Sequence, residues 1–222
     1  MSIPLKRAKV CVVGEQSVGK TCIINRTIKN TFSQDLRPTV ADVYKYPYKK
    51  NGNNIEFEIW DTAGQETYRS LVPMYWQKAN VIIVVYDITS SNSYDALEEW
   101  TRFIPETIFN SAVVLLVGNK LDLKNARVIE YSKADDFSSL YNFTKYFEVS
   151  ALSGEGINDV WDFIAETPEV QDISIDNDDI PDPSNPSNPP NPPNPPNPES
   201  NGIISTITGY LYSAYEYVKS FF

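Results

Sequence analysis

Two continuous apolar runs in the middle of the chain restrict its fold more than any other feature. They read VIIVVY at residues 81–86 and VVLLVG at residues 113–118. Apolar runs of this length, without polar alternation, are typical of strands that are buried on both faces. Such strands belong to parallel sheets with helices on both sides, so the sequence predicts an α/β fold.

Shorter runs extend the alternation of strand and helix over residues 1–165, which we expect to form one domain. Further strands are expected at residues 8–13, 45–50, 55–60 and 146–149. Helical patterns lie at residues 19–29, 93–103, 132–141 and 156–165. The dipeptide Asn51-Gly52 is a strong hairpin signal between the second and third strands. The pattern predicts a mostly parallel six-stranded sheet with helices on both faces, whose ligands bind beyond the carboxyl ends of the strands.

Charge and composition exclude several classes of function. Residues 1–165 carry 20 acidic and 18 basic side chains, whereas residues 166–222 carry 9 and 1, so no basic cluster indicates nucleic acid. The chain has no histidine, which excludes histidine-based catalysis and histidine metal sites. Its two cysteines lack metal-site spacing, and no secretion signal precedes them, so we expect a cytosolic protein without disulfides.

The segment GEQSVGKT, residues 14–21, follows the first strand and opens the first helix. It fits the phosphate-binding pattern G-x-x-x-x-G-K-[ST], in which glycines let successive backbone N–H groups surround phosphate oxygens. Lys20 would supply a positive charge to the outer phosphates, and the Thr21 hydroxyl could bind Mg²⁺. A phosphate site is therefore expected at this loop.

The segment WDTAGQE, residues 60–66, follows the third strand. Asp61 at the strand end is placed to hold Mg²⁺ through water. Gly64 allows the backbone to approach a terminal phosphate, and Gln65 could orient an attacking water. The alternative is a simple polar turn, but a phosphate loop of this kind requires such an acid.

The segment NKLD, residues 119–122, follows the run VVLLVG. The Asp122 carboxylate can accept two parallel hydrogen bonds, which matches the N1–H and 2-amino donors of guanine. Adenine has an acceptor at N1 and no 2-amino group, and would leave a carboxylate unpaired. The sequence therefore favours GTP over ATP and disfavours an ATP-using enzyme.

GEQSVGKT, Thr39 in RPTV, WDTAGQE, NKLD and SAL at residues 150–152 occur in the order and spacing of small Ras-superfamily GTPases. The resemblance covers residues 8–165. Within it TAGQETYRSLVPMY, VVYDIT and LLVGNKLDL look most like the Rab family, especially its Golgi-associated Rab-six branch. The resemblance implies a P-loop G domain that hydrolyses GTP to GDP. Hydrolysis would be slow unless a separate activating protein supplied an arginine.

By position, the resemblance also implies the roles of individual residues. Gln65 would be the catalytic residue, and Thr21, Thr39 and Asp61 would hold Mg²⁺. Nucleotide contacts would come from Gly14, Ser17, Val18, Gly19, Lys20, Thr21, Cys22, Phe32, Thr39, Gly64, Asn119, Lys120, Asp122, Ser150, Ala151 and Leu152.

Among these, Phe32 would stack on guanine and the Ala151 amide would bond its carbonyl oxygen. Cys22 would act through its backbone. Residues 33–44 and 62–76 would change with the bound nucleotide and contact an exchange factor, an activating protein and effectors.

The chain departs from the Rab pattern at three positions. Thr39 is followed by VADVY, which is as similar to the Rho type as to Rab. No extra helix follows NKLD, which argues against the Rho type. Ala41 replaces a glycine, and Leu152 replaces the usual lysine. Two alternatives to a Rab-type traffic switch are a nucleotide-bound scaffold with little turnover and a Rho-like signalling switch.

Residues 166–202 are expected to form a disordered linker. Residues 166–182 carry seven acids and no base, and residues 181–198 hold ten of the sixteen prolines. Repeated Asn-Pro-Pro favours a polyproline II spacer with about 55 Å of reach. The alternative, recruitment of a proline-binding partner, lacks a flanking basic residue.

Residues 203–222 are expected to form an amphipathic helix. At 100° per residue one arc holds only apolar side chains, those of Ile203, Ile204, Ile207, Tyr210, Leu211, Ala214, Tyr215, Val218, Phe221 and Phe222. No cysteine follows Cys22, so C-terminal prenylation is not expected. We expect this helix to bind the cytosolic face of Golgi or endosomal membranes reversibly; a spanning helix or docking on a protein are the alternatives.

Overall fold

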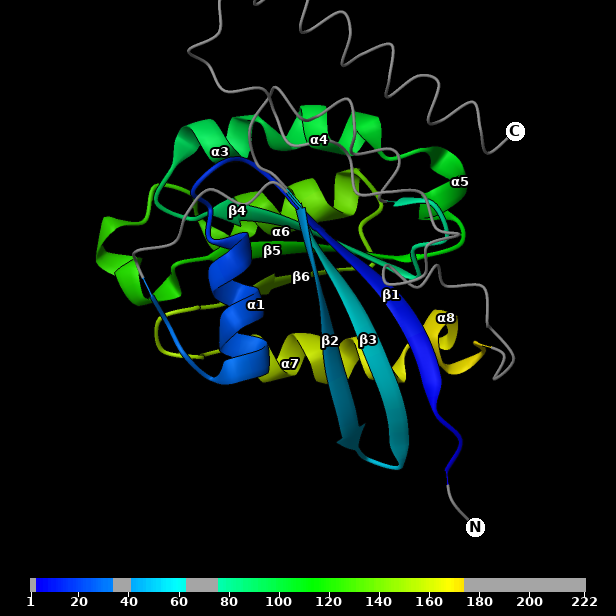
Figure 1. Ribbon diagram of the computed structural model, residues 1–222. Coiled ribbons are helices and arrows are strands. Elements are labelled where there is room, and N and C mark those ends of the chain that lie inside the picture. The colour runs from blue at the N-terminus through cyan, green and yellow to red at the C-terminus, as the bar shows by residue number, and fades with distance from the viewer. Residues whose placement is uncertain (1–2, 34–40, 63–75, 174–222) are drawn as a thin grey trace, which may run out of the picture. The chain divides into compact units, whose positions relative to one another are not determined.

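The six expected strands form one sheet in a computed structural model that describes residues 3–33, 41–62 and 76–173 (Figure 1). Their bounds are β1 Lys6–Val13, β2 Ala41–Lys50, β3 Asn53–Thr62, β4 Val81–Asp87, β5 Val113–Asn119 and β6 Lys145–Glu148. The order across the sheet is β2-β3-β1-β4-β5-β6. Only β2 runs antiparallel to its neighbour, which confirms the mostly parallel sheet.

A tight turn joins the antiparallel pair β2 and β3. Lys50 pairs with Asn53 across a two-residue loop. The φ angles of Asn51 and Gly52 are 53° and 79°, and both lie in the left-handed region that a type I′ turn requires. The Asn-Gly signal therefore identified the hairpin correctly.

The two central apolar runs are buried along their whole length. Every residue of β4 and of β5 is buried, as expected for strands covered on both faces. The two strands are in register, and the last pair at their carboxyl ends joins Asp87 to Asn119. Polar side chains that follow separate apolar runs in the sequence thus meet at one edge of the sheet.

Helices cover both faces of the sheet. α1 (Lys20–Lys29) and α7 (Ile157–Glu166) lie on one face, and α3 (Ser91–Asp95), α4 (Leu97–Phe103) and α6 (Tyr131–Leu140) lie on the other (Figure 1). The helix expected over residues 93–103 is divided at Ala96. The remaining short helices, which the sequence pattern did not indicate, are α5 Glu106–Phe109, η2 Leu121–Ala126 and α8 Pro168–Gln171.

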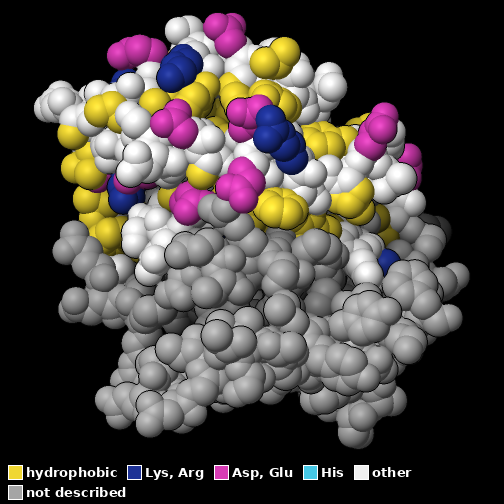
Figure 2. Space-filling view, turned by 90° about the horizontal axis from the view of Figure 1, so that it is seen from above, with side chains coloured by type: hydrophobic (Ala, Val, Ile, Leu, Met, Phe, Trp, Pro, Cys, Tyr) yellow, Lys and Arg dark blue, Asp and Glu magenta, His cyan; other side chains and the backbone are white. Residues whose placement is uncertain are grey.

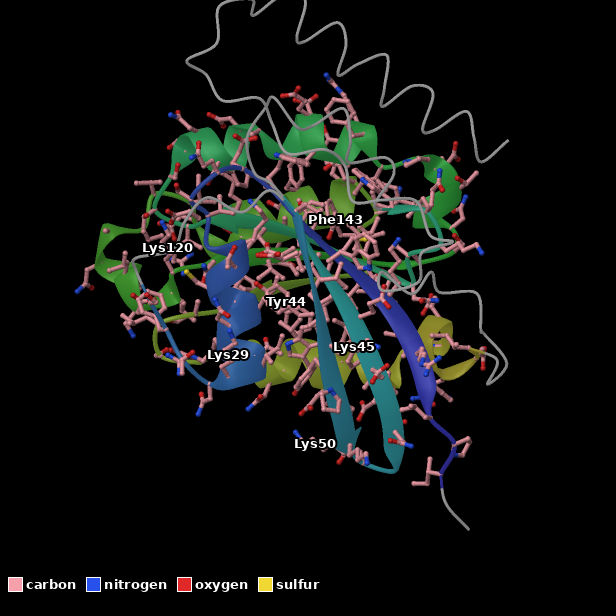
Figure 3. The ribbon with its side chains drawn as sticks, in the orientation of Figure 1. Lys29, Tyr44, Lys45, Lys50, Lys120 and Phe143 are labelled. Carbon is pink, nitrogen blue, oxygen red and sulfur yellow. The ribbon has the colours of Figure 1, made fainter. Side chains whose placement is uncertain are left out.

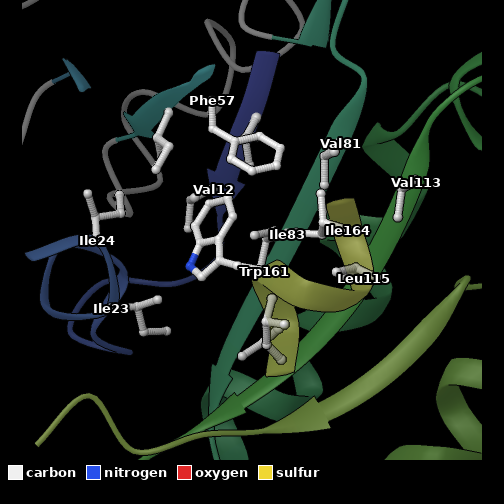
Figure 4. Packing of buried hydrophobic residues seen from close by; sticks show 14 of the residues in the cluster. Val12, Ile23, Ile24, Phe57, Val81, Ile83, Val113, Leu115, Trp161 and Ile164 are labelled. Atoms are coloured by element: carbon white, nitrogen blue, oxygen red, sulfur yellow. The ribbon is translucent and has the colours of Figure 1, made fainter. Parts of the chain in front are cut away.

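The core between the sheet and the α1–α7 face is built around Trp161 of α7 (Figure 4). Its ring lies 5.1 Å from that of Phe57, measured between centroids, and it is 2% exposed. The indole N–H donates to the Thr27 hydroxyl at 2.9 Å, so the polar atom is satisfied within the core. Trp161 therefore fixes α7 against α1, the helix that follows the phosphate loop.

The packed chain continues beyond residue 165, where the sequence placed the end of the domain and the start of a solvated acidic segment. Pro168 begins α8, and Val170 and Ile173 are buried in the core. Gln171 donates to the Asn53 side chain at 2.7 Å. Val170 and Ile173, three positions apart, pack this turn onto the core. The acidic residues around them led the sequence pattern to indicate a solvated segment.

The face formed by α3 and α4 carries charges of both signs. Figure 2 shows acidic and basic side chains scattered among apolar and polar ones there. On α4, Arg102 pairs with Glu98 at 2.5 Å. Basic side chains therefore do not gather on the described part of this face.

Three expectations lie outside the described residues. They concern the two segments 34–40 and 63–75, the part of the linker that follows residue 173, and the amphipathic helix at residues 203–222. Among the helices that the structure does describe, none combines the length and apolarity that a membrane crossing requires.

Candidate nucleotide-binding site

The loop between β1 and α1 has the backbone conformation that its glycines permit. Gly14 and Gly19 have φ angles of 135° and 96°, in the region that side chains other than glycine rarely adopt. A Cβ atom on Gly14 would collide with the Val85 carbonyl oxygen, and one on Gly19 would collide with the Asn119 amide. The loop therefore approaches two neighbouring segments so closely that only glycine fits.

The loop ends at the N-terminus of α1. Gly19 is the N-cap residue, and it offers no side chain to the first N–H groups of the helix. Those groups, together with the helix dipole, form a site for an anion. The ten-residue helix thus points its donors at the space that phosphates would occupy.

Lys20 is held against the phosphate loop that precedes it. Its ammonium donates to the carbonyl oxygens of Gly14 and Glu15, both at 2.8 Å. The side chain is buried, and this burial lowers the pKa of the ammonium to about 8, although Asp61 and Glu15 oppose the shift. A buried ammonium whose hydrogen bonds all go to the loop is preorganised to bind a phosphate.

Thr21 and Asp61 bring two oxygen ligands together from α1 and β3. The Thr21 hydroxyl donates to Asp61 Oδ2 at 2.6 Å, and Asp61 is 1% exposed. Hydroxyl and carboxylate oxygens suit Mg²⁺, which is commonly held by one or two protein oxygens together with substrate phosphates. The described residues contain no group of three or more acidic or cysteine side chains that could hold a metal ion.

Asn119 joins the phosphate loop to the loop at residues 149–154. Its amide N–H donates to the Val18 carbonyl at 2.8 Å, and its amide oxygen accepts from the Ala151 N–H at 3.2 Å. The side chain is 1% exposed, so both hydrogen bonds lie within the protein. One residue therefore sets the distance between the phosphate and base ends of the site.

The other two polar side chains of NKLD are also held by partners. Lys120 has a φ of 71° and pairs with Asp87 at 2.5 Å. Asp122 is exposed and accepts from the buried Ser150 hydroxyl at 2.5 Å. Asp122 is thus oriented by the neighbouring loop while its carboxylate stays accessible to a ligand.

Asp87 is the site residue that the sequence analysis missed. Its Oδ1 accepts hydrogen bonds from both the backbone and the hydroxyl of Thr89, at 2.8 and 2.7 Å, while its Oδ2 faces Lys120. The signal was present, because Asp87 directly follows the run at 81–86, as Asp61 and Asn119 follow theirs.

Several expected contacts lie at the margin of the site. Phe32 and Cys22 are half-buried and pack against the core, and burial raises the pKa of the Cys22 thiol. Leu152 is 47% exposed. Ser17 adopts a φ of 64°, so the loop bends at a residue other than glycine as well.

The structure brings together expected residues at the carboxyl ends of four strands, β1, β3, β5 and β6. Thr39, Gly64 and Gln65 lie outside the described residues. In the described part, the loop at residues 14–21 thus lies beside the segment NKLD and the loop at residues 149–154.

Comparison with known proteins identifies the class of protein. The model of the Ras family matches residues 9–169. The putative ras-related protein Rab-5B of Dictyostelium discoideum is 37% identical over 156 residues, which are 70% of this chain and 72% of that protein. The Ras-related protein Rab-30 of Homo sapiens is 35% identical over 150 residues, 67% and 73% of the two chains. The GTP-binding protein YPT1 of Saccharomyces cerevisiae is 34% identical over 154 residues, 69% and 74%.

The chain therefore belongs to the Ras family and is a Rab-type small GTPase. It is a switch that binds GTP, hydrolyses it to GDP and acts in vesicle traffic, under exchange factors, activating proteins and effectors. The resemblance drawn from the motifs is confirmed at this level, and neither the scaffold nor the Rho-like alternative is favoured.

Proposed function

We propose that the loops at residues 14–21, 119–122 and 150–152 bind the guanine nucleotide in the roles that the motifs predict. Phosphates bind at the loop of residues 14–21 and at Lys20, and the base binds between Asn119, Asp122 and Ala151. The observation that carries this proposal is the Asn119 side chain, which bonds both Val18 and Ala151. This side chain joins the phosphate loop to the loop that carries Ala151 without the help of a bound nucleotide.

Calorimetry with GDP, GTP and ATP tests the proposed recognition of the base. The wild-type protein should bind both guanine nucleotides far more tightly than ATP. Asp122→Ala should weaken GDP and GTP selectively, on the order of 100-fold, because a carboxylate bond to two donors is lost. Asp135→Ala, at an exposed position of α6, is the control and should leave affinity unchanged. Equal affinity of the wild type for ATP and GTP would refute the assignment.

We propose that Mg²⁺ is the cofactor, held by Thr21, Asp61 and Thr39. When bound, the ion neutralises charge that develops on the phosphates. The Thr21 hydroxyl already faces Asp61, so the pair needs only a small rotation of the hydroxyl to offer both oxygens. Thr21→Asn should favour the GDP-bound or empty protein, and a variant that still captures effectors like the wild type would count against the role.

Gln65 is proposed to orient the attacking water. Gln65→Leu should slow single-turnover hydrolysis while leaving GTP affinity intact, because the proposed role is to position water and not to hold bound GTP. Unchanged hydrolysis in this variant would reject the catalytic role.

Residues 33–44 and 62–76 are the proposed contacts for the exchange factor, the activating protein and the effectors. The first segment contains the proposed Mg²⁺ ligand Thr39 and the second directly follows Asp61, so bound nucleotide can bias both segments. Capture of an activating protein should therefore depend on nucleotide state and be lost when Arg69 within the second segment is changed to Glu.

The segment at residues 203–222 is the proposed attachment to the membrane surface of the Golgi or endosomes. Its apolar arc in the helical wheel supports this proposal. Ile207→Glu combined with Leu211→Glu should release the protein into the soluble fraction, whereas Ser205→Glu on the polar arc should matter less. If the double variant sediments with membranes as the wild type does, this segment is not the anchor.

A further inference from the structure

Arg26, in the last turn of α1, makes four hydrogen bonds that no motif accounts for. Its Nε donates to the Ala151 carbonyl at 2.9 Å, and Nη2 donates to the Leu152 carbonyl at 2.5 Å. Nη1 donates to the backbone and side-chain oxygens of Asn30 at 2.9 and 3.1 Å. One guanidinium therefore ties the end of α1 to the loop that carries the base-binding amide.

The Ala151 peptide is fixed from two directions. Its N–H donates to Asn119, and the carbonyl of the same residue accepts from Arg26. Ala151 is 2% exposed, so water cannot readily replace either partner. The direction of the Ala151 N–H is thus set jointly by Asn119 and Arg26.

Geometry makes arginine the suitable residue at this position. Two neighbouring carbonyls and the C-cap residue Asn30 accept from three different nitrogens of one planar group. A lysine has one nitrogen at the end of a flexible stem and cannot address three acceptors in fixed directions. The contact also uses the carbonyl of Leu152 and not its side chain, so it does not require the usual lysine there.

The helix that carries Arg26 begins at the phosphate loop. α1 starts at Lys20 and ends at Lys29, which Figure 3 labels at the far end of the helix from Lys20. The N-terminus of α1, which faces the phosphate loop, and Arg26, which holds the loop at residues 149–154, are therefore on one rigid helix. Trp161 holds that element to α7 through Thr27, next to Arg26.

We propose that Arg26 is a positioning residue for guanine recognition: it holds the backbone at Ala151, whose N–H donates to Asn119 in this structure, in place to donate to the carbonyl oxygen on C6 when the base is bound. This inference rests on the base-binding arrangement under Proposed function. It goes further in assigning specificity to a residue that does not touch the nucleotide. Arg26 should then affect nucleotide affinity only to the extent that the Ala151 N–H contributes a hydrogen bond to the group on C6.

Binding of GDP and 6-thio-GDP to the full chain tests this proposal. The analogue keeps the N1–H and 2-amino donors that Asp122 reads and replaces only the oxygen on C6 by a sulfur, which is a weaker acceptor. In the wild type, GDP should bind more tightly than 6-thio-GDP. In Arg26→Ala, GDP affinity should fall about tenfold and 6-thio-GDP affinity less, so that the ratio of the two affinities moves toward one.

Two variants control the interpretation. Arg26→Lys keeps the charge and most of the stem and should behave as Arg26→Ala does, and it serves as the test if the alanine variant unfolds. Arg102→Ala removes an exposed arginine with a single carboxylate partner on α4 and should leave the ratio unchanged.

Different outcomes separate this inference from the function that it rests on. If the wild type discriminates between the two nucleotides and both Arg26 variants keep the same ratio, Arg26 only supports the fold and the inference is overturned. If the wild type binds GDP and 6-thio-GDP equally well, the proposed contact between the Ala151 amide and C6 is refuted, and the inference on Arg26 is refuted with it.

Discussion

The phosphate end and the base end of the site are built in different ways. At the phosphate end, a glycine-rich loop and the first turn of α1 present backbone groups and Lys20, all within eight consecutive residues. At the base end, groups from three separate loops hold one another: the Asn119 side chain with the Ala151 N–H, Asp122 with Ser150, and Lys120 with Asp87.

This difference has a physical cause. Phosphate is a strong anion that many N–H donors can bind, so a short loop with the right dihedral angles is sufficient. A base is distinguished only by the direction of a few donors and acceptors, which requires side chains with fixed orientations. Neighbouring loops supply that rigidity at the base end.

The largest effect should come from breaking the point where the two ends meet. In Gly19→Ala the new Cβ would collide with the Asn119 amide at a backbone φ of 96°. GDP affinity should fall on the order of 1000-fold or more, about 4 kcal/mol, by calorimetry. Gly52→Ala is the matched control, because its φ of 79° is also strained but nothing lies within 4 Å. It should lower stability by about 1 kcal/mol and leave affinity intact; similar losses in the two variants would contradict this account.

Removing the Asn119 bridge should have the next largest effect. Asn119→Ala loses its bonds to Val18 and Ala151 and leaves both backbone groups unpaired, so GDP affinity should fall about 100-fold, or about 2.7 kcal/mol. Asn80→Ala, which loses the bond from the Lys9 N–H at 2.9 Å, removes a similar contact elsewhere. If Asn80→Ala weakens GDP as much, the effect reflects folding and not the bridge.

Chelation of Mg²⁺ should act on the phosphate end alone. Excess chelator should speed release of a fluorescent GDP from the wild type at least tenfold, about 1.4 kcal/mol, because a shared cation is removed from Thr21, Asp61 and the phosphates. In Thr21→Ala the same addition should change release less. Preference for guanine over adenine should persist without the metal, and its loss would show that the two ends are not separable in this way.

The smallest effect should come from the partly exposed pair at the base end. Lys120 and Asp87 have side-chain exposures of 33% and 9%. A double-mutant cycle with Lys120→Met and Asp87→Asn should give a coupling energy of about 1 kcal/mol in GDP affinity. Arg102→Met with Glu98→Gln, an exposed pair on α4, should show no coupling in the same measurement.

Much of the fold was predictable from local patterns. The strands at 81–86 and 113–118 were identified because continuous apolar runs need cover on both faces, and the hairpin was identified because Asn51-Gly52 favours positive φ angles. The end of the packed chain was not predictable in this way, because burial of Val170 and Ile173 depends on where the core lies and not on the acidic residues around them.

The candidate site divides in the same way. Gly14, Lys20 and Thr21 could be assigned to one loop-and-helix segment from the sequence, because eight residues in one order set their spacing. Arg26 was missed because its role depends on Ala151, a partner that lies 125 residues away in the sequence. Asp87 had the same position after an apolar run as Asp61 and Asn119, but its partner Lys120, 33 residues away, is seen only in the structure.

By itself, the sequence determined the class of fold, the phosphate loop and the choice of guanine, since these follow from hydrophobic period, glycine at strained angles and the donor pattern that a carboxylate can read. Only the tertiary structure decided how Asn119 joins the two ends, which residue steadies the Ala151 peptide, and where the packed chain ends. The reason is that hydrogen bonds and burial between distant segments depend on the relative position of whole helices and strands, which no local pattern specifies.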